Sequence, residues 1–267
     1  MMKTVAKIAG FLLLVAAVAA AILQIIFPTP ESFNCGRLPV LIAHAGGAIN
    51  GKTYTNAMEA VELSVRNDYR FIELDLDVTA EGHIAAVHYW NEFHIQTGCV
   101  WDTLPLLSGD FKSRKIQDSL HPLSGGDIGR LFPAPLYLVT DKIADYNLIN
   151  KEISVDKNRL LVECFSYRNY RTALQYGIKY PMLNIQGGGN LLKYAALLFA
   201  RKVKIITVPI EMLTSCGEAL ACLHRYGIII FAYTSNDRDF ILKHSGKTVS
   251  GFYTDSVTCM PIGSRTK

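Results

Sequence analysis

The sequence predicts a (β/α)8 TIM barrel that follows an N-terminal transmembrane helix. Eight short apolar runs alternate with longer helix-like segments after residue 37. The 237 residues from 31 to 267 suit the usual size of this barrel. Half of the chain is hydrophobic, which is ample for one core. A separate apolar run, residues 8–27, predicts the transmembrane helix.

The first 30 residues differ in composition from the rest and are expected to form a membrane anchor or signal segment. Residues 8–27 carry no charge and follow Lys3 and Lys7. Small residues around Ala17 and Ala21 leave a cleaved signal peptide open, but the apolar run continues to Phe27, which favours an uncleaved anchor. The preceding lysines place residues 31–267 on the outer side of the inner membrane, which is the periplasm in a bacterium.

Eight runs rich in Val, Ile, Leu and aromatic residues are predicted to be the parallel strands. Several are apolar without alternation, as strands buried on both faces are. The predicted strands are Leu38–Ala43, Arg70–Asp75, Leu136–Asp141, Arg159–Cys164, Tyr180–Ile185, Lys204–Ile210, Gly227–Tyr233 and Gly251–Thr254.

A ninth strand-like run, Ile84–His88, follows Asp77 after only six residues. A parallel crossover needs about a dozen residues, so this run is predicted to fold back antiparallel. Asn56–Glu59 has the pattern of a capping box, and a helix is expected to follow it. Residues 191–201 and 218–226 are also predicted to be helical. Residues 91–135 lack clear periodicity and are expected to form an insertion over the barrel mouth.

Charge and cysteine content exclude several classes of protein. The net charge of +4 is small and its lysines and arginines are scattered, so no nucleic-acid partner is expected. No CxxC pair occurs, which argues against a zinc or thioredoxin-like site. An outer compartment would tolerate disulfides, and Cys216 and Cys222 are close enough in sequence to pair. The six cysteines are Cys35, Cys99, Cys164, Cys216, Cys222 and Cys259.

Polar residues gather at the predicted carboxyl ends of the strands, where such barrels place their active sites. Glu73, Asp75 and Asp77 share one face of their strand because side chains alternate along it. A cluster of carboxylates repels itself without a cation, and oxygen ligands suit Ca²⁺ or Mg²⁺. The alternative is that one acid pairs with Lys142 and the others are solvated. The residues at these ends are His44, Glu73, Asp75, His88, Asp141, Lys142, Glu163 and Tyr233.

Histidines and glycines complete the expected site. Two imidazoles beside a metal, His44 and His88, suit general acid–base catalysis. Gly46 and Gly47 could let backbone amides approach an anionic oxygen, although a tight turn explains them equally well. The strands are therefore expected to present acid–base groups and metal ligands around one phosphate.

The order of these motifs resembles the glycerophosphodiester phosphodiesterase family, (β/α)8 barrels related to phosphatidylinositol-specific phospholipases C. That family has His-Arg-Gly, Glu-x-Asp, a Thr-x-(Asp)-Gly turn, His-Asp, Glu-x-Lys and Thr-Asp. The resemblance covers about residues 38–258, and the HAGG…YTN start is similar to a bacterial branch. The matching residues are His44-Ala45-Gly46, Glu73-Leu74-Asp75, Thr79–Gly82, His88-Tyr89, Asp141-Lys142 and Thr254-Asp255.

The resemblance implies a metal-dependent phosphodiesterase that releases glycerol phosphate from glycerophosphodiesters or lysophospholipid head groups. By position, it implies His44 and His88 as the acid–base pair, with Gly46, Lys142 and Tyr233 as substrate contacts. It also implies that the metal ligands are Glu73, Asp75 and Asp141.

Three departures from the family pattern leave two alternatives open. Ala45 stands where the family has Arg, Tyr89 where it has Asp, and Asp141 where it has Glu. One alternative is a phospholipase C or D that acts on lipid of the membrane. The other is a membrane-anchored binding module that has lost turnover, which Ala45 favours.

Overall fold

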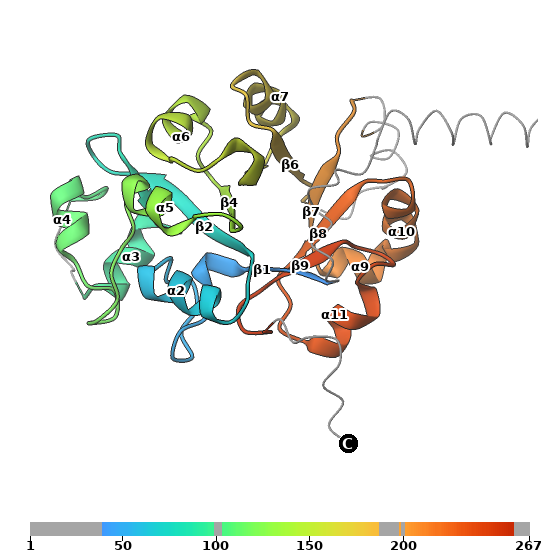
Figure 1. The fold of residues 1–267 in the computed structure, drawn as a ribbon, viewed down its shortest axis with the longest axis horizontal. Coiled ribbons are helices and arrows are strands. Elements are labelled where there is room, and N and C mark those ends of the chain that lie inside the picture. The colour runs from blue at the N-terminus through green and yellow to red at the C-terminus, as the bar shows by residue number, and fades with distance from the viewer. Residues whose placement is uncertain (1–38, 99–102, 187–197, 199–200, 259–267) are drawn as a thin grey trace, which may run out of the picture.

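A computed structural model describes residues 39–98, 103–186, 198 and 201–258 (Figure 1). The predicted anchor, residues 1–30, lies outside this part of the chain, as does most of the predicted helix at residues 191–201. Within the described ranges, no helix has the length and apolar character needed to cross a membrane.

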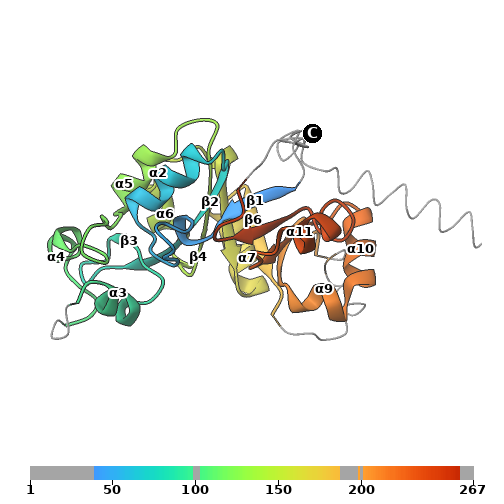
Figure 2. The ribbon, with the colours of Figure 1, turned by 90° about the horizontal axis from the view of Figure 1, so that it is seen from below.

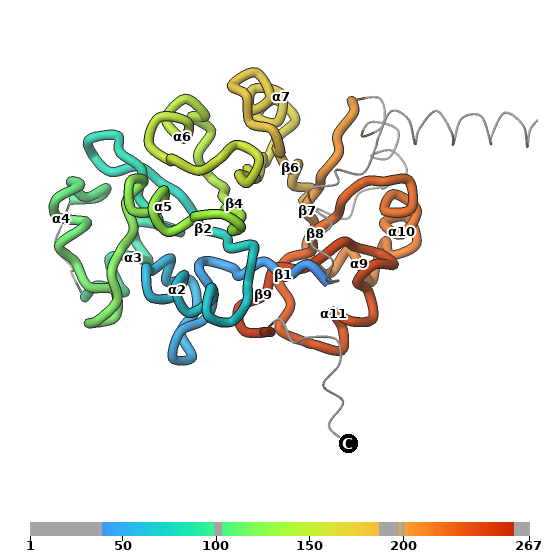
Figure 3. Tube along the Cα trace, in the orientation of Figure 1, coloured from blue at the N-terminus to red at the C-terminus, as the bar shows by residue number. Residues whose placement is uncertain are grey.

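Eight parallel strands form a closed barrel, as predicted. Strand β1 pairs with β9 on one side and with β2 on the other, which closes the ring (Figure 3). Each predicted run contains one strand or overlaps it closely. The barrel strands are β1 (Val40–Ala43), β2 (Phe71–Val78), β4 (Tyr137–Asp141), β5 (Leu160–Cys164), β6 (Tyr180–Asn184), β7 (Ile205–Pro209), β8 (Ile229–Tyr233) and β9 (Gly251–Thr254).

The predicted antiparallel hairpin is also present. Strand β3 (Ile84–Ala86) pairs antiparallel with the end of β2, with Leu76 opposite Ala86 and Val78 opposite Ile84. The short connection between β2 and β3 allows no other pairing of neighbours. From the end of β2 the hairpin returns the chain to the level of Asp75, whose carbonyl oxygen accepts from the N–H of Val87 at 3.0 Å, and His88 is the next residue.

Helices surround the strands, and Figure 2 shows them on the outside of the barrel from a second direction. Helix α10 matches the predicted helix at residues 218–226 to within one residue. The helices are α2 (Met58–Arg66), α3 (Trp90–Gln96), α4 (Ser108–Ser113), α5 (Gly125–Leu131), α6 (Tyr146–Glu152), α7 (Tyr167–Gln175), α9 (Glu211–Ser215), α10 (Gly217–Arg225) and α11 (Arg238–His244), with 3-10 turns η2 (His44–Gly46) and η3 (Lys157–Arg159).

The predicted capping box at the start of α2 is wrong. The N-cap residue is Ala57, and no side chain caps the helix. Asn56 has a left-handed backbone, with φ of 49°, and its side chain bonds to Asp75 instead. The Glu59 carboxylate accepts a hydrogen bond from the backbone N–H of His121 at 2.8 Å. Asn56 and Glu59 therefore form tertiary contacts instead of the capping box that the local pattern predicted.

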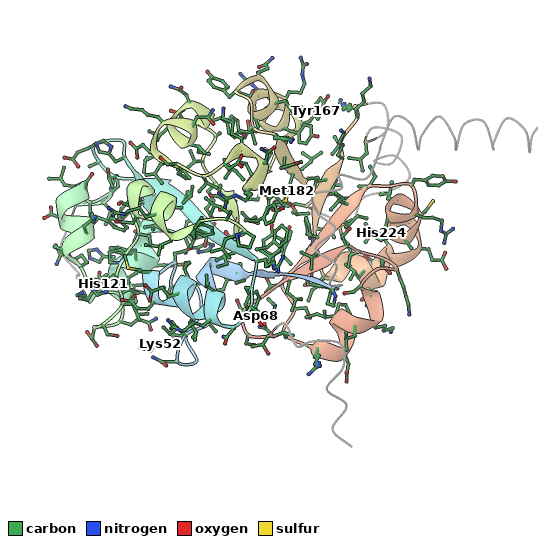
Figure 4. All side chains as sticks on the ribbon, in the orientation of Figure 1. Lys52, Asp68, His121, Tyr167, Met182 and His224 are labelled. Atoms are coloured by element: carbon green, nitrogen blue, oxygen red, sulfur yellow. The ribbon has the colours of Figure 1, made fainter. Side chains whose placement is uncertain are left out.

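Two apolar layers hold the barrel together. Alternate strand residues such as Phe71, Leu161 and Met182 fill its interior, and Figure 4 labels Met182 among the strands. The residues between them, such as Ile72, pack between the strands and the helices. Because Glu73 lies two residues after the inward-facing Phe71, the same alternation turns it into the barrel.

The segment 91–135 contains most of α3 together with α4 and α5. It packs in a separate apolar cluster that includes Phe93, Phe111 and Ile116, together with residues of α2 and β3. Figures 1 and 2 both show α3 and α4 to the side of the barrel, beyond β2. The segment therefore flanks the barrel instead of covering it, and α3 is the part that reaches the predicted site, through a contact of Glu92 with His88.

The three described cysteines, Cys164, Cys216 and Cys222, are free. The possible disulfide between Cys216 and Cys222 is therefore absent. Cys216 caps α10 and Cys222 lies six residues further along it, so their side chains point to different sides of the helix.

Candidate active site

Three carboxylates converge at the carboxyl ends of β2 and β4. The strands are in register with Asp75 opposite Asp141, and Glu73 precedes Asp75 by two residues on the same face. One oxygen from each of the three acids lies within 4.8 Å of the others. Glu73 and Asp75 are each 3% exposed. Asp77 is not part of this acid triad, and its Oδ1 accepts a hydrogen bond from the backbone N–H of Val78 at 2.7 Å.

The triad is electrostatically unfavourable by itself. Burial, followed by the charges of Asp75 and Asp141, raises the pKa of Glu73 well above its ordinary value. Burial and the charge of Asp75 likewise raise the pKa of Asp141. The Oδ1 atom of Asp141 is buried without a hydrogen-bond partner. An unpartnered buried acceptor beside two further carboxylates fits a hard divalent cation, so the triad could hold a metal.

Lys142 provides a positive charge next to the triad. Its Nζ lies 3.3 Å from Asp75 Oδ1, donates to the carbonyl oxygen of His88 at 2.6 Å, and sits 4.0 Å from the centre of the Tyr89 ring. Lys142 has a left-handed backbone, with φ of 62°. The alternative in which one acid pairs with Lys142 and the others are solvated is thus half right. Asp75 does pair with Lys142, but Glu73 is buried.

Asn56 fixes the orientation of Asp75, a role that the sequence did not reveal. Its Nδ2 donates to Asp75 Oδ2 at 3.0 Å, and its Oδ1 accepts from the backbone N–H of Asp75 at 3.0 Å. The only local signal, a polar residue before a helix, pointed to a cap.

His44 follows β1 and is held by a carboxylate. Its Nδ1 lies 2.9 Å from Oδ1 of Asp255, and the other oxygen of Asp255 accepts from Asn236 at 2.7 Å. Burial raises the pKa of Asp255, but the hydrogen bonds from His44 and Asn236 outweigh it and leave that pKa below its ordinary value. This arrangement occupies Nδ1 of His44 and leaves Nε2 for chemistry.

His88 is held in the same way from a different element. Its Nδ1 lies 2.7 Å from Oε2 of Glu92, and its Nε2 lies 4.0 Å from Asp75 Oδ1. The Tyr54 ring contacts both imidazoles, with centroid distances of 4.6 Å to His44 and 5.1 Å to His88. The structure therefore brings both predicted acid–base residues to the acid triad.

The glycines after His44 form a tight turn. The N–H of Gly47 donates to the His44 carbonyl at 2.7 Å, so this amide closes the turn and does not face a ligand. Ala45 has φ of 49°, is fully buried, and donates its N–H to Glu73 Oε2 at 2.7 Å. Gly46 has φ of +84°, and an added Cβ would meet the Ala60 side chain at 3.3 Å. Its predicted contact with substrate remains a prediction.

Glu163 is the centre of a separate buried network at the ends of β5 to β9. It accepts hydrogen bonds from Asn184, from Thr207 at 2.7 Å and from Tyr253 at 2.9 Å. Burial raises its pKa, although these hydrogen bonds oppose the shift. The Tyr233 hydroxyl donates to Asn184 Oδ1 at 3.2 Å, which places this predicted pocket residue in the wall beside the network.

Solved structures share this architecture. A phosphodiesterase from Oleispira antarctica, in complex with the product sn-glycerol-3-phosphate, aligns with a TM-score of 0.69 at 13% identity over 82% of this chain and 93% of its own. The chain has the fold of this phosphodiesterase. A glycerophosphodiester phosphodiesterase from Thermotoga maritima aligns with a TM-score of 0.64 at 16% identity, over 82% and 95% of the two chains. One from Parabacteroides distasonis has a TM-score of 0.64 at 13% identity, over 88% of each chain.

No protein-family model matches the chain, and no curated protein matches it. At 13–16% identity, the structural likeness establishes the barrel, while the chemistry must be argued from the site.

Proposed function

We propose that this protein is a divalent-metal-dependent phosphodiesterase that hydrolyses glycerophosphodiesters to glycerol phosphate and an alcohol. The observation that carries the proposal is the acid triad of Glu73, Asp75 and Asp141 next to two imidazoles, each held by its own carboxylate. The fold shared with the three phosphodiesterases, one bound to a glycerol phosphate product, supports the same reaction class.

In this proposal the imidazoles provide acid–base catalysis. One of His44 and His88 removes a proton from the attacking water or substrate hydroxyl, and the other gives a proton to the leaving alcohol oxygen. Asp255 and Glu92 hold Nδ1 of these rings. Nε2 is therefore the atom of each ring that exchanges the proton.

The acid triad would hold Ca²⁺ or Mg²⁺, which suit an all-oxygen ligand set. Such an ion, when bound, offsets negative charge on the phosphoryl oxygens. Lys142 carries a second positive charge at the same place, so it is proposed to contact the phosphate. Gly46 and Tyr233 are proposed to line the substrate pocket.

We also propose that residues 8–27 anchor the barrel to the inner membrane, with the site on the periplasmic side. The uncharged run of 20 residues after Lys3 and Lys7 supports this placement. Protease protection of the barrel in intact cells, lost when the outer membrane is opened, would test it.

Turnover of glycerophosphocholine by the purified chain tests the reaction. The variant His44→Ala is expected to lower kcat by about 10²–10⁴-fold, because it removes one acid–base group. The control is His83→Ala, since His83 also pairs with a carboxylate, at 2.8 Å from Glu152, but lies outside the site. A chelator should abolish turnover, and added Ca²⁺ or Mg²⁺ should restore it. Undiminished turnover in His44→Ala would remove that histidine from the mechanism.

A panel of diesters separates the two alternatives. Hydrolysis of micellar lipid but not of soluble head-group diesters would indicate a phospholipase C or D. A catalytically inactive binding module is the second candidate because Ala45 stands where the family has Arg, so the first turn offers no guanidinium for the phosphate. Calorimetry that detects metal or ligand binding, without hydrolysis of any diester, would indicate that module.

A further inference from the structure

His88, which follows the hairpin, contacts a residue of a helix outside the barrel strands. His88 Nδ1 lies 2.7 Å from the carboxylate of Glu92, in the first turn of α3 (Trp90–Gln96). We propose that Glu92 is a positioning residue for His88: it fixes the Nδ1–H tautomer and turns Nε2 to the acid triad. This inference rests on the proposed phosphodiesterase function and names a component of that site which the motif pattern does not contain.

The contact differs from an ordinary exposed pair on a helix, which contributes little. The His88 side chain is only 22% exposed, whereas Glu92 is 45% exposed. The opposite ring nitrogen, Nε2, lies 4.0 Å from Asp75 Oδ1. Both nitrogens therefore have a defined neighbour, one at the rim and one in the site. A carboxylate on Nδ1 sets which nitrogen carries the proton in a neutral imidazole.

The residue next to His88 supplies no carboxylate to the imidazole, so Glu92 supplies it from the helix. The residue after His88 is Tyr89, whose ring faces the Lys142 ammonium group at 4.0 Å and offers no carboxylate to the imidazole. Glu92 comes four residues after His88, so the start of α3 brings it back over the imidazole. The result matches the pair at the other end of the site, where Asp255 holds Nδ1 of His44 at 2.9 Å.

A second contact from the same helix supports a positioning role. Gln96, one turn beyond Glu92, donates to the carbonyl oxygen of Tyr54 at 3.2 Å. The Tyr54 ring in turn contacts both imidazoles. One face of α3 therefore holds His88 directly through Glu92 and the aromatic neighbour of both histidines through Gln96.

Nitrogen NMR on the full-length chain with ¹⁵N-labelled histidine tests the tautomer directly. At a pH where the ¹⁵N shifts identify a neutral ring, wild-type His88 should carry its proton on Nδ1. The size-matched Glu92→Gln, which keeps the helix, and Glu92→Leu, which lacks an acceptor, should both raise the Nε2–H form. A wild-type ring with Nε2–H, or the same tautomer in all three proteins, would overturn the proposal.

Kinetics provide the second readout. Glu92→Gln and Glu92→Leu are expected to lower kcat by about 10- to 100-fold with little change in KM, by analogy with the loss of a carboxylate that orients a metal-bound histidine. Glu92→Asp, which keeps the charge, should recover part of this loss. The matched control is Glu152→Gln, which alters the similar pair with His83 outside the site. A kcat within twofold of wild type in both Gln and Leu variants would contradict the role of Glu92.

The two readouts separate this inference from the proposed function. If the wild-type chain hydrolyses no diester but the His88 tautomer changes with Glu92, the phosphodiesterase assignment fails and the positioning contact stands. If turnover is normal and neither readout responds to Glu92, the inference fails and the phosphodiesterase assignment stands.

Discussion

The acid triad should make the metal-free protein less stable than a variant with one charge fewer. The variant Glu73→Gln removes one of three carboxylates that lie within 4.8 Å of each other. Its amide oxygen can still accept the hydrogen bond that Ala45 N–H donates to Glu73 at 2.7 Å. The variant therefore changes the charge of the triad with little change in shape.

Two calculations give the size of the effect. Two unit charges 4.8 Å apart at an effective dielectric of about 20 repel by about 3.5 kcal/mol. Protonation sets an upper bound, because neutralising a carboxyl with the ordinary glutamate pKa of 4.5 costs about 3.4 kcal/mol at pH 7. The pairing of Lys142 with Asp75 relieves part of the repulsion. In chelator at neutral pH, Glu73→Gln should thus raise the free energy of unfolding by about 1–3 kcal/mol.

The gain should depend on pH in a defined direction. Burial and the neighbouring acids raise the pKa of Glu73, so the folded protein binds more protons than the unfolded chain above about pH 4.5. Wild-type stability therefore falls as pH rises, and its difference from the variant grows as pH rises from about 4.5 towards neutral. Urea unfolding in chelator across this range measures it. A variant that is less stable than wild type at neutral pH would refute this reasoning.

Two further predictions concern carboxylates elsewhere in the fold. Asp255→Asn, which removes the anionic partner of His44, should lower kcat on glycerophosphocholine by at least about 10²-fold, and a shift in thermal midpoint without loss of kcat would contradict it. Burial raises the pKa of Asp127, but its hydrogen bonds with Ser124 of the capping box, Lys112 and Arg130 lower it more. The pKa therefore falls from 3.8 to about 2. Asp127→Asn should lower the free energy of unfolding by about 1–2 kcal/mol at neutral pH, a modest amount because Lys112 and Arg130 are exposed to solvent. This loss should disappear as pH falls from about 4 to about 2, and urea unfolding measures both effects.

Features governed by short periods in the sequence were predictable. The strands follow from apolar runs, and the hairpin follows from a connection too short for a crossover. The convergence of Glu73 and Asp75 follows from the two-residue period of a strand, and the arrival of Asp141 beside them follows from parallel pairing of β2 with β4. These rules require only neighbours in sequence or in the sheet.

The partners of the catalytic candidates could not be predicted in this way. Asp255 is 211 residues from His44, and Asn56 is 19 residues from Asp75. The sequence identified Asp255 only as a motif position and Asn56 only as a helix cap. Their contacts with His44 and Asp75 depend on the geometry of loops. Asn56 shows the difficulty most clearly, because its left-handed backbone takes it away from the helix that its side chain was expected to cap.

Few positively charged groups lie next to the acid triad. Ala45 supplies no cation, and its N–H is already committed to Glu73. Among the ion pairs of the described residues, the one that brings a lysine or arginine to the triad is that of Lys142 with Asp75. The triad has three carboxylates and one lysine beside it, and a divalent cation would offset this excess of acidic groups. Because residue 45 is an alanine, it adds no positive charge, and a bound metal would supply it. This is the physical reason to expect that chelation affects folding stability as well as turnover.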